Sequence, residues 1–157
     1  MRKATIFGTA VLLALAVSLA SARAEEPRSL RFEKTINYKL DKLIDLNATV
    51  GPVHIAKVEL SQPSGAASLA DRLRGATLSE TESVVRATFD AENPEEDEWV
   101  VTFTLDFLDS RGKLIDRAVG KEGLEGESKV VKVDHAILTY VLPSIDRVEI
   151  KLEARLD

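Results

Sequence analysis

The chain has 157 residues and no cysteine, and its 26 acidic and 21 basic side chains give a formal charge of −5 at neutral pH. Without cysteine there can be no disulfide, so stability must come from a packed core. The acidic balance argues against nucleic acid and anionic membrane surfaces as partners.

The first 24 residues predict a secretory signal peptide. Arg2 and Lys3 supply a positive start, residues 6–19 are mostly apolar, and residues 22–24 read Ala-Arg-Ala before the expected cut. The apolar run is shorter than the roughly 20 residues that cross a bilayer. We therefore expect cleavage after Ala24, no membrane insertion of the mature chain, and a periplasmic or secreted protein. Removal of this leader would leave 133 residues with a formal charge of −8.

The mature residues 25–157 are expected to form one domain made mainly of β-strands. A bulge or a break is expected near Asp41-Lys42, where the apolar period slips. Val58 and Leu60 are the surest core positions of their strand. Strands are predicted where apolar and polar residues alternate: Ile36–Leu40, Val53–Leu60, Ser83–Ala91, Trp99–Leu108, Leu114–Val119, Lys129–Val133 and Ile145–Leu152.

Two short segments have helical features. Ser68–Gly75 begins with a capping pattern and ends on a glycine. Residues 134–142 have apolar side chains at helical spacing, with Asp134 as a cap and Pro143 as a stop. The same residues are rich in strand-forming types, so that a strand is the alternative to the short helix that we favour.

Trp99–Val119 is the most regular stretch and predicts a β-hairpin. Every second residue from Trp99 to Phe107 is apolar, which places Trp99 in the core, and residues 109–112 read as a tight turn. Residues 92–98 predict an acidic turn that joins the strand Ser83–Ala91 to the hairpin as an antiparallel pair. Residues 120–128, with three glycines, predict a flexible loop.

These elements predict an all-β fold. We expect an antiparallel, immunoglobulin-like β-sandwich of about seven strands with one or two short helical turns. A small barrel is the alternative.

The hairpin also carries a family resemblance. Leu105-Asp106-Phe107-Leu108-Asp109, followed by Gly112 and Ile115, resembles the strand–turn signature of FxLYD-type bacterial sandwich domains. In this chain Leu105 stands where that pattern has Phe, and Leu108 stands where it has Tyr. The resemblance covers residues 83–152 and implies a sandwich fold and an exported setting. It brings no catalytic residues with it.

Few residues suggest catalysis. His54 and His135 are the two histidines, and surface or capping roles suit both; no Gly-x-Ser-x-Gly elbow, phosphate loop or dinucleotide fingerprint is present. We therefore expect no enzymatic activity and no cofactor. The most distinctive polar feature is the acidic turn, whose candidate binding residues are Glu92, Glu95, Glu96, Asp97 and Glu98.

Two functions remain open at this point. The first is an exported, non-catalytic module that binds or supports another envelope protein, with its oligomeric state undetermined. The second is a small-ligand or calcium-binding module that uses residues 92–98 and 120–128, because clustered carboxylates suit Ca²⁺. A solvated turn that protects a sheet edge is the plainer interpretation of the acidic residues.

Overall fold

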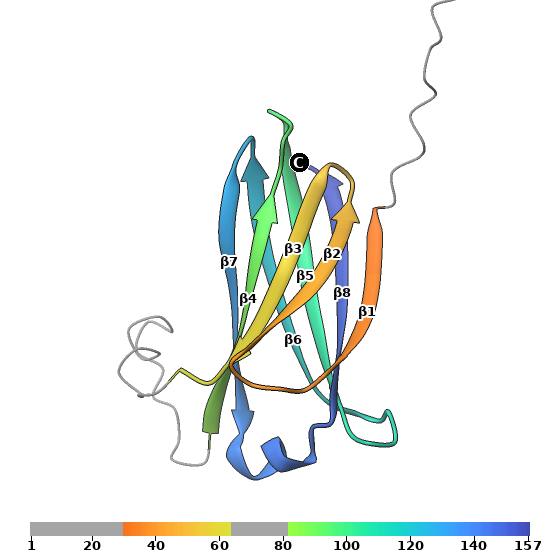
Figure 1. Ribbon diagram of the computed structural model, residues 1–157, viewed down its shortest axis with the longest axis vertical. Helices are drawn as coiled ribbons and strands as arrows, with labels where there is room; N and C mark the ends of the chain where they lie inside the picture. Colours follow the sequence, from red (N-terminus) through yellow and green to blue (C-terminus); the bar gives the residue numbers. More distant parts are fainter. Residues whose placement is uncertain (1–29, 64–81) are drawn as a thin grey trace, which may run out of the picture.

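Eight antiparallel strands in two four-stranded sheets make up most of residues 30–63 and 82–157, the part of the chain that the computed structural model describes (Figure 1). The first sheet has the order β1-β8-β5-β6 and the second has the order β2-β3-β4-β7. The strands are β1 (Arg31–Asn37), β2 (Lys42–Val50), β3 (Val53–Ser61), β4 (Glu82–Glu92), β5 (Glu98–Leu108), β6 (Leu114–Glu125), β7 (Ser128–Leu138) and β8 (Arg147–Leu156). The predicted all-β antiparallel sandwich is confirmed, with eight strands instead of about seven.

The core lies between the two sheets and is made of the alternating apolar residues of their inner faces. Phe89 of β4 and Phe103 of β5 belong to opposite sheets, and their ring centroids are 4.8 Å apart. Val58 and Leu60 are fully buried, as the sequence predicts. Trp99 is only partly buried and packs at the margin of this core. Each large side chain withdrawn from water contributes about 1.5–3 kcal/mol.

The predicted hairpin between β5 and β6 is confirmed. The two strands pair in antiparallel register from Glu98↔Glu125 to Leu108↔Leu114. The turn is held by Asp109, whose carboxylate accepts hydrogen bonds from the backbone N–H groups of Arg111 and Lys113 at 2.9 and 2.8 Å. Gly112 has φ +80°, a left-handed conformation that favours glycine.

The predicted pairing of the β4 segment with β5 is wrong. β4 pairs with β3 and β7, whereas β5 pairs with β6 and β8, so residues 93–97 carry the chain from one sheet to the other. The alternation pattern cannot distinguish these two arrangements, because a short connection between two half-buried strands can close a hairpin or cross the sandwich.

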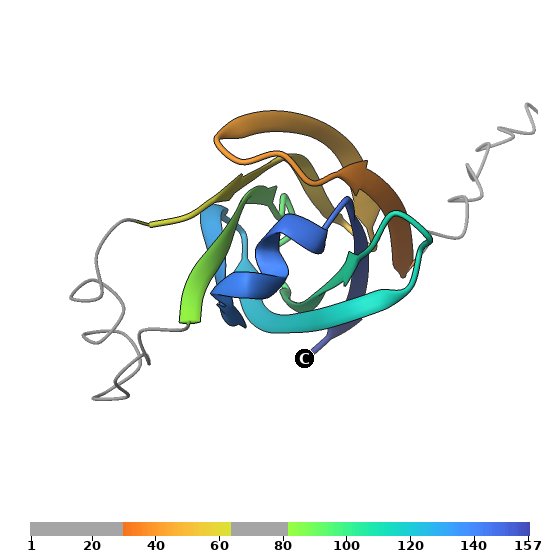
Figure 2. The same cartoon turned by 90° about the horizontal axis from the view of Figure 1, so that it is seen from below.

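The helix favoured for residues 134–142 is also wrong over its first half. β7 continues to Leu138, paired with Glu82 at the start of β4, and Ile137 faces the core. The neighbouring strand supplies hydrogen-bond partners along this whole length, and this tertiary context outweighs the helical spacing. Only the 3₁₀-helix η1 (Thr139–Ser144) follows, with Pro143 inside it, and it lies across the lower end of the sandwich (Figure 2). The last strand therefore begins at Arg147 instead of Ile145.

The flexible loop predicted for residues 120–128 is also wrong. β6 runs to Glu125 and β7 begins at Ser128, so most of this segment is strand. Its glycines serve close packing and a tight turn. A Cβ at Gly120 would lie 2.6 Å from Val133 Cγ2, and Gly126 has φ +52°.

The predicted break near Asp41-Lys42 is confirmed. β1 ends at Asn37, Asp41 has φ +53°, and β2 begins at Lys42 in the other sheet. The predicted signal peptide, residues 1–24, and the predicted helix at Ser68–Gly75 lie outside the described residues. Within the ranges 30–63 and 82–157, no helix has the length and apolar character needed to cross a membrane.

Candidate interaction surface

The acidic turn, residues 92–98, is held in place by the uncharged residue Asn93, which the acidic pattern of the sequence does not point to. Asn93 is 1% exposed. Its Nδ2 donates to the carbonyl oxygens of Asp97 and Leu124 at 2.9 and 2.8 Å, and its Oδ1 accepts from the N–H of Glu95 at 3.1 Å. One buried amide thus holds the turn closed and ties it to β6.

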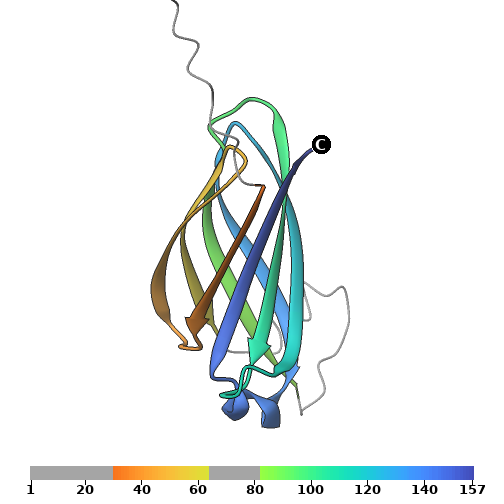
Figure 3. The same ribbon diagram turned by 90° about the vertical axis from the view of Figure 1, so that its right-hand side faces the viewer.

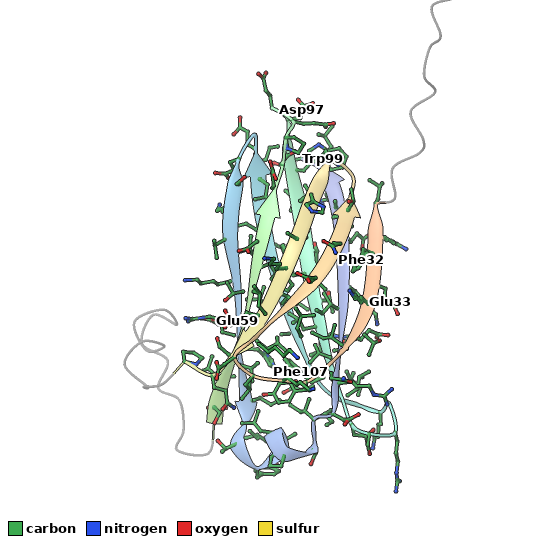
Figure 4. The ribbon with its side chains drawn as sticks, in the orientation of Figure 1. Phe32, Glu33, Glu59, Asp97, Trp99 and Phe107 are labelled. Atoms are coloured by element: carbon green, nitrogen blue, oxygen red, sulfur yellow. The ribbon has the colours of Figure 1, made fainter. Side chains whose placement is uncertain are left out.

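The five candidate carboxylates do not converge on one point. Glu92 ends β4 and Glu98 begins β5, and the side chains of Glu92, Glu96, Asp97 and Glu98 are exposed, with Asp97 pointing away from the body at the upper end (Figure 4). Glu95 is half-buried. Among the residues that the structure describes, no three His, Asp or Glu side chains gather to hold a metal ion. Because residues 120–125 belong to β6 and β7 begins at Ser128, only the two-residue turn at residues 126–127 remains of the second predicted binding loop.

The two histidines lie far from each other. His54 of β3 pairs with Glu92 at one end of β4, whereas His135 of β7 pairs with Val85 near the other end. His135 stacks on the ring of Phe107, and its Nε2 lies 3.2 Å from Asp116 Oδ2. The two imidazoles cannot act on one ligand.

A buried charge on the outer face of the first sheet is the polar feature that the sequence analysis did not single out. Asp106 of β5 is 2% exposed, although it belongs to the polar face of its strand. Its carboxylate accepts from Arg117 Nε and Nη2 on β6 and, at 2.9 Å, from Lys151 Nζ on β8. The hydrogen bond from Arg117 is the largest cause that lowers the pKa of Asp106. The cluster joins the three strands β6, β5 and β8 across their outer surface.

This ionic cluster continues toward β1. Lys151 also pairs with Glu149 at 2.6 Å, and hydrogen bonds to Glu149 and Asp106 raise the pKa of Lys151. Glu33 of β1 lies beside Glu149, and that neighbouring carboxyl raises the pKa of Glu33. Asp106 and Glu149 thus each have a basic partner that lowers the pKa of the carboxyl group, which is the chemistry of a structural cluster.

β1 has a different environment on each of its two edges. Among the described strands it pairs only with β8, so every second N–H and C=O along its other edge faces away from the sheet. Viewed from that side, β1 lies between β8 and β2 (Figure 3). Lys34 Nζ reaches across and donates to the carbonyl oxygen of Asp45 of β2 at 2.9 Å.

Two hollows flank this strand. The outer hollow, of about 480 Å³, is lined by residues 31–33 of β1, by Thr102 and Thr104 of β5, and by residues 151–153 of β8. The second, of about 350 Å³, lies between the edges of β1 and β2 and is lined by residues 35–37, Lys39 and residues 42–44. We call this second hollow the β1–β2 seam. The outer hollow lies over the face of the first sheet, whereas the β1–β2 seam follows the free edge of β1 and suits an extended chain that lies along that edge.

The opposite side of the sandwich is closed. β6 and β7 follow each other through the turn at Gly126, and the side chain of Val133 packs directly over Gly120. Lys129 of β7 forms an ion pair with Glu122 of β6. The two sheets are therefore joined along one side and separated by the β1–β2 seam along the other.

Comparison with known proteins adds little to this geometry. No protein-family model matches the chain, and no curated protein sequence matches it. Solved structures do match, among them the enzymatically active domain of tailspike protein 4 from bacteriophage CBA120, with 10% identity and a TM-score of 0.21. That match covers 82% of this chain and 18% of the tailspike chain. A TM-score this low carries no argument about fold or function.

Proposed function

We propose that the protein is an exported, non-catalytic β-sandwich that acts as a protein-interaction or structural module of the cell envelope. Its location is the periplasm or the secreted fraction, and its partner is another envelope protein. Export is supported by the signal-peptide pattern of residues 1–24. The resemblance of residues 105–115 to FxLYD-type domains fits the same setting.

The observation that carries the proposal is the one-sided pairing of β1. An exposed strand edge with unpaired backbone groups is a template for pairing with another chain. The rest of the first sheet is held together by the Asp106 cluster, so that β1 is presented on a rigid support. The β1–β2 seam along the free edge of β1 leaves room for partner side chains.

A site-specific cross-linking experiment in the native cell envelope tests this function. A photoreactive amino acid replaces Thr35, which is exposed on β1 and lines the β1–β2 seam. The matched control is Thr88, a threonine on the outer face of the opposite sheet, paired with Glu59 and Lys132. We expect a discrete adduct with a second envelope protein from position 35 and none from position 88. Equal adducts from both positions, or none from either, would contradict the proposal.

A further inference from the structure

The β1–β2 seam has an unusual charge for this protein. The whole chain carries a formal charge of −5, yet the charged residues that line the seam are Lys39 and Lys42, and no carboxylate lines it. A third lysine, Lys34, extends from β1 to the carbonyl oxygen of Asp45 on β2. Lys39 and Lys42 thus give the lining of the seam a positive charge, while the neighbouring Asp41 and Asp45 lie outside that lining.

The seam also offers apolar surface. Leu43 is 54% exposed, and Ile44 beside it is partly buried at the margin of the core. Side chains of an extended chain alternate between its two faces. Leu43 and Ile44 are consecutive in β2 and lie on opposite faces of it, with Lys42 on the face of Ile44. A segment with alternating acidic and apolar residues would therefore place its carboxylates toward Lys42 and its apolar side chains toward Leu43.

A second copy of this chain fits the seam poorly. Two copies that met through the same edge would bring lysine against lysine, and like charges that face each other across paired strands are destabilising. Lysine on an edge strand is also a known protection against pairing with identical copies. The charge therefore favours a different chain that brings the opposite sign.

From these observations we infer that the β1–β2 seam binds an extended, acidic segment of a partner protein, which adds as a strand to the free edge of β1. The inference rests on the function proposed above and names the chemistry of its partner. Backbone hydrogen bonds to β1 would supply affinity, and ion pairs to Lys39 and Lys42 would select acidic segments.

Direct binding with designed peptides tests the inference on the purified protein. The probe is a fluorescently labelled ten-residue peptide of alternating valine and glutamate, and its matched control alternates valine and lysine. We expect the acidic peptide to bind at least tenfold more tightly, although the net charge of the protein alone would favour the basic one. N-methylation of alternate peptide nitrogens should abolish binding, because it removes backbone donors and keeps the charge.

Variants locate the site. The double variant Lys39→Glu, Lys42→Glu should weaken acidic-peptide binding at least tenfold, whereas Lys132→Glu, on the exposed face of β7, should leave it unchanged. Urea unfolding of each variant confirms that the fold is intact. Equal binding of both peptides, or an effect of Lys132→Glu as large as that of the double variant, would overturn the inference. So would a dimer of the protein alone that the same double variant dissociates. If neither peptide binds while position 35 still cross-links to an envelope protein, the proposed function stands and the inferred binding of an acidic strand is rejected.

Discussion

Replacement of Asn93 by alanine tests how the acidic turn is held. The side chain is 1% exposed and makes three hydrogen bonds, two to carbonyl oxygens and one from a backbone N–H. Each such bond contributes about 1 kcal/mol net, and a carbonyl left buried without a donor adds to the loss. We expect Asn93→Ala to lower the free energy of unfolding by about 3 kcal/mol and the melting temperature by about 10 °C.

Urea unfolding followed by the fluorescence of Trp99, the single tryptophan, measures this loss. Asn37→Ala, at an exposed position that ends β1, is the matched control and should change stability by less than about 0.5 kcal/mol. Asn93→Asp should be at least as damaging as Asn93→Ala, because a carboxylate would face two carbonyl oxygens. If Asn93→Ala unfolds at the wild-type midpoint, then the turn does not depend on this amide and the reasoning is refuted.

Three further outcomes are expected. Asp106→Asn should lower the free energy of unfolding by about 2 kcal/mol at neutral pH. Because folding lowers the pKa of Asp106, the stabilisation by its carboxylate is complete above the ordinary pKa of 3.8 and is lost as the pH falls through the pKa of the folded protein. The stability difference between wild type and variant should therefore shrink in unfolding curves taken below about pH 4. Gly120→Ala should lower the free energy of unfolding by about 1–3 kcal/mol, because the added methyl group overpacks against Val133. Adding Val133→Ala to this variant should recover part of the loss. Equal melting temperatures of wild type and Gly120→Ala would contradict the contact. N-terminal sequencing of the envelope-fraction protein should begin at Glu25, whereas an intact Met1 in the cytoplasm would refute export.

The hairpin and the core positions could be predicted because they depend on local pattern. Side chains two residues apart share a face of a strand, so Phe103, Leu105 and Phe107 had to lie on one side of β5, and all three are buried. The turn at Asp109 follows from the side-chain chemistry of four consecutive residues. Such features need no knowledge of which strands become neighbours.

The remaining features depend on partners that are distant in sequence. Asp106 is buried because Arg117 and Lys151, 11 and 45 residues away, converge on it from the two neighbouring strands. Asn93 is buried because Leu124, 31 residues away, offers a carbonyl group. The alternation of β5 places Asp106 on the polar face of its strand and gives Asn93 no role, because alternation carries no information on strand order.

The same distinction separates the parts of the molecule that stabilise the fold from the part proposed to bind. Asp106 and Asn93 are buried and hydrogen-bonded to neighbouring strands or turns, whereas Lys39 and Lys42 are exposed beside the free edge of β1. We therefore expect two classes of variant. Substitutions of the two lysines should weaken acidic-peptide binding at an unchanged urea midpoint, and Asn93→Ala or Asp106→Asn should lower the midpoint at an unchanged peptide affinity of the folded protein. A lysine variant that loses stability in proportion to affinity would mean that the seam is part of the core, and that its charge serves folding instead of recognition.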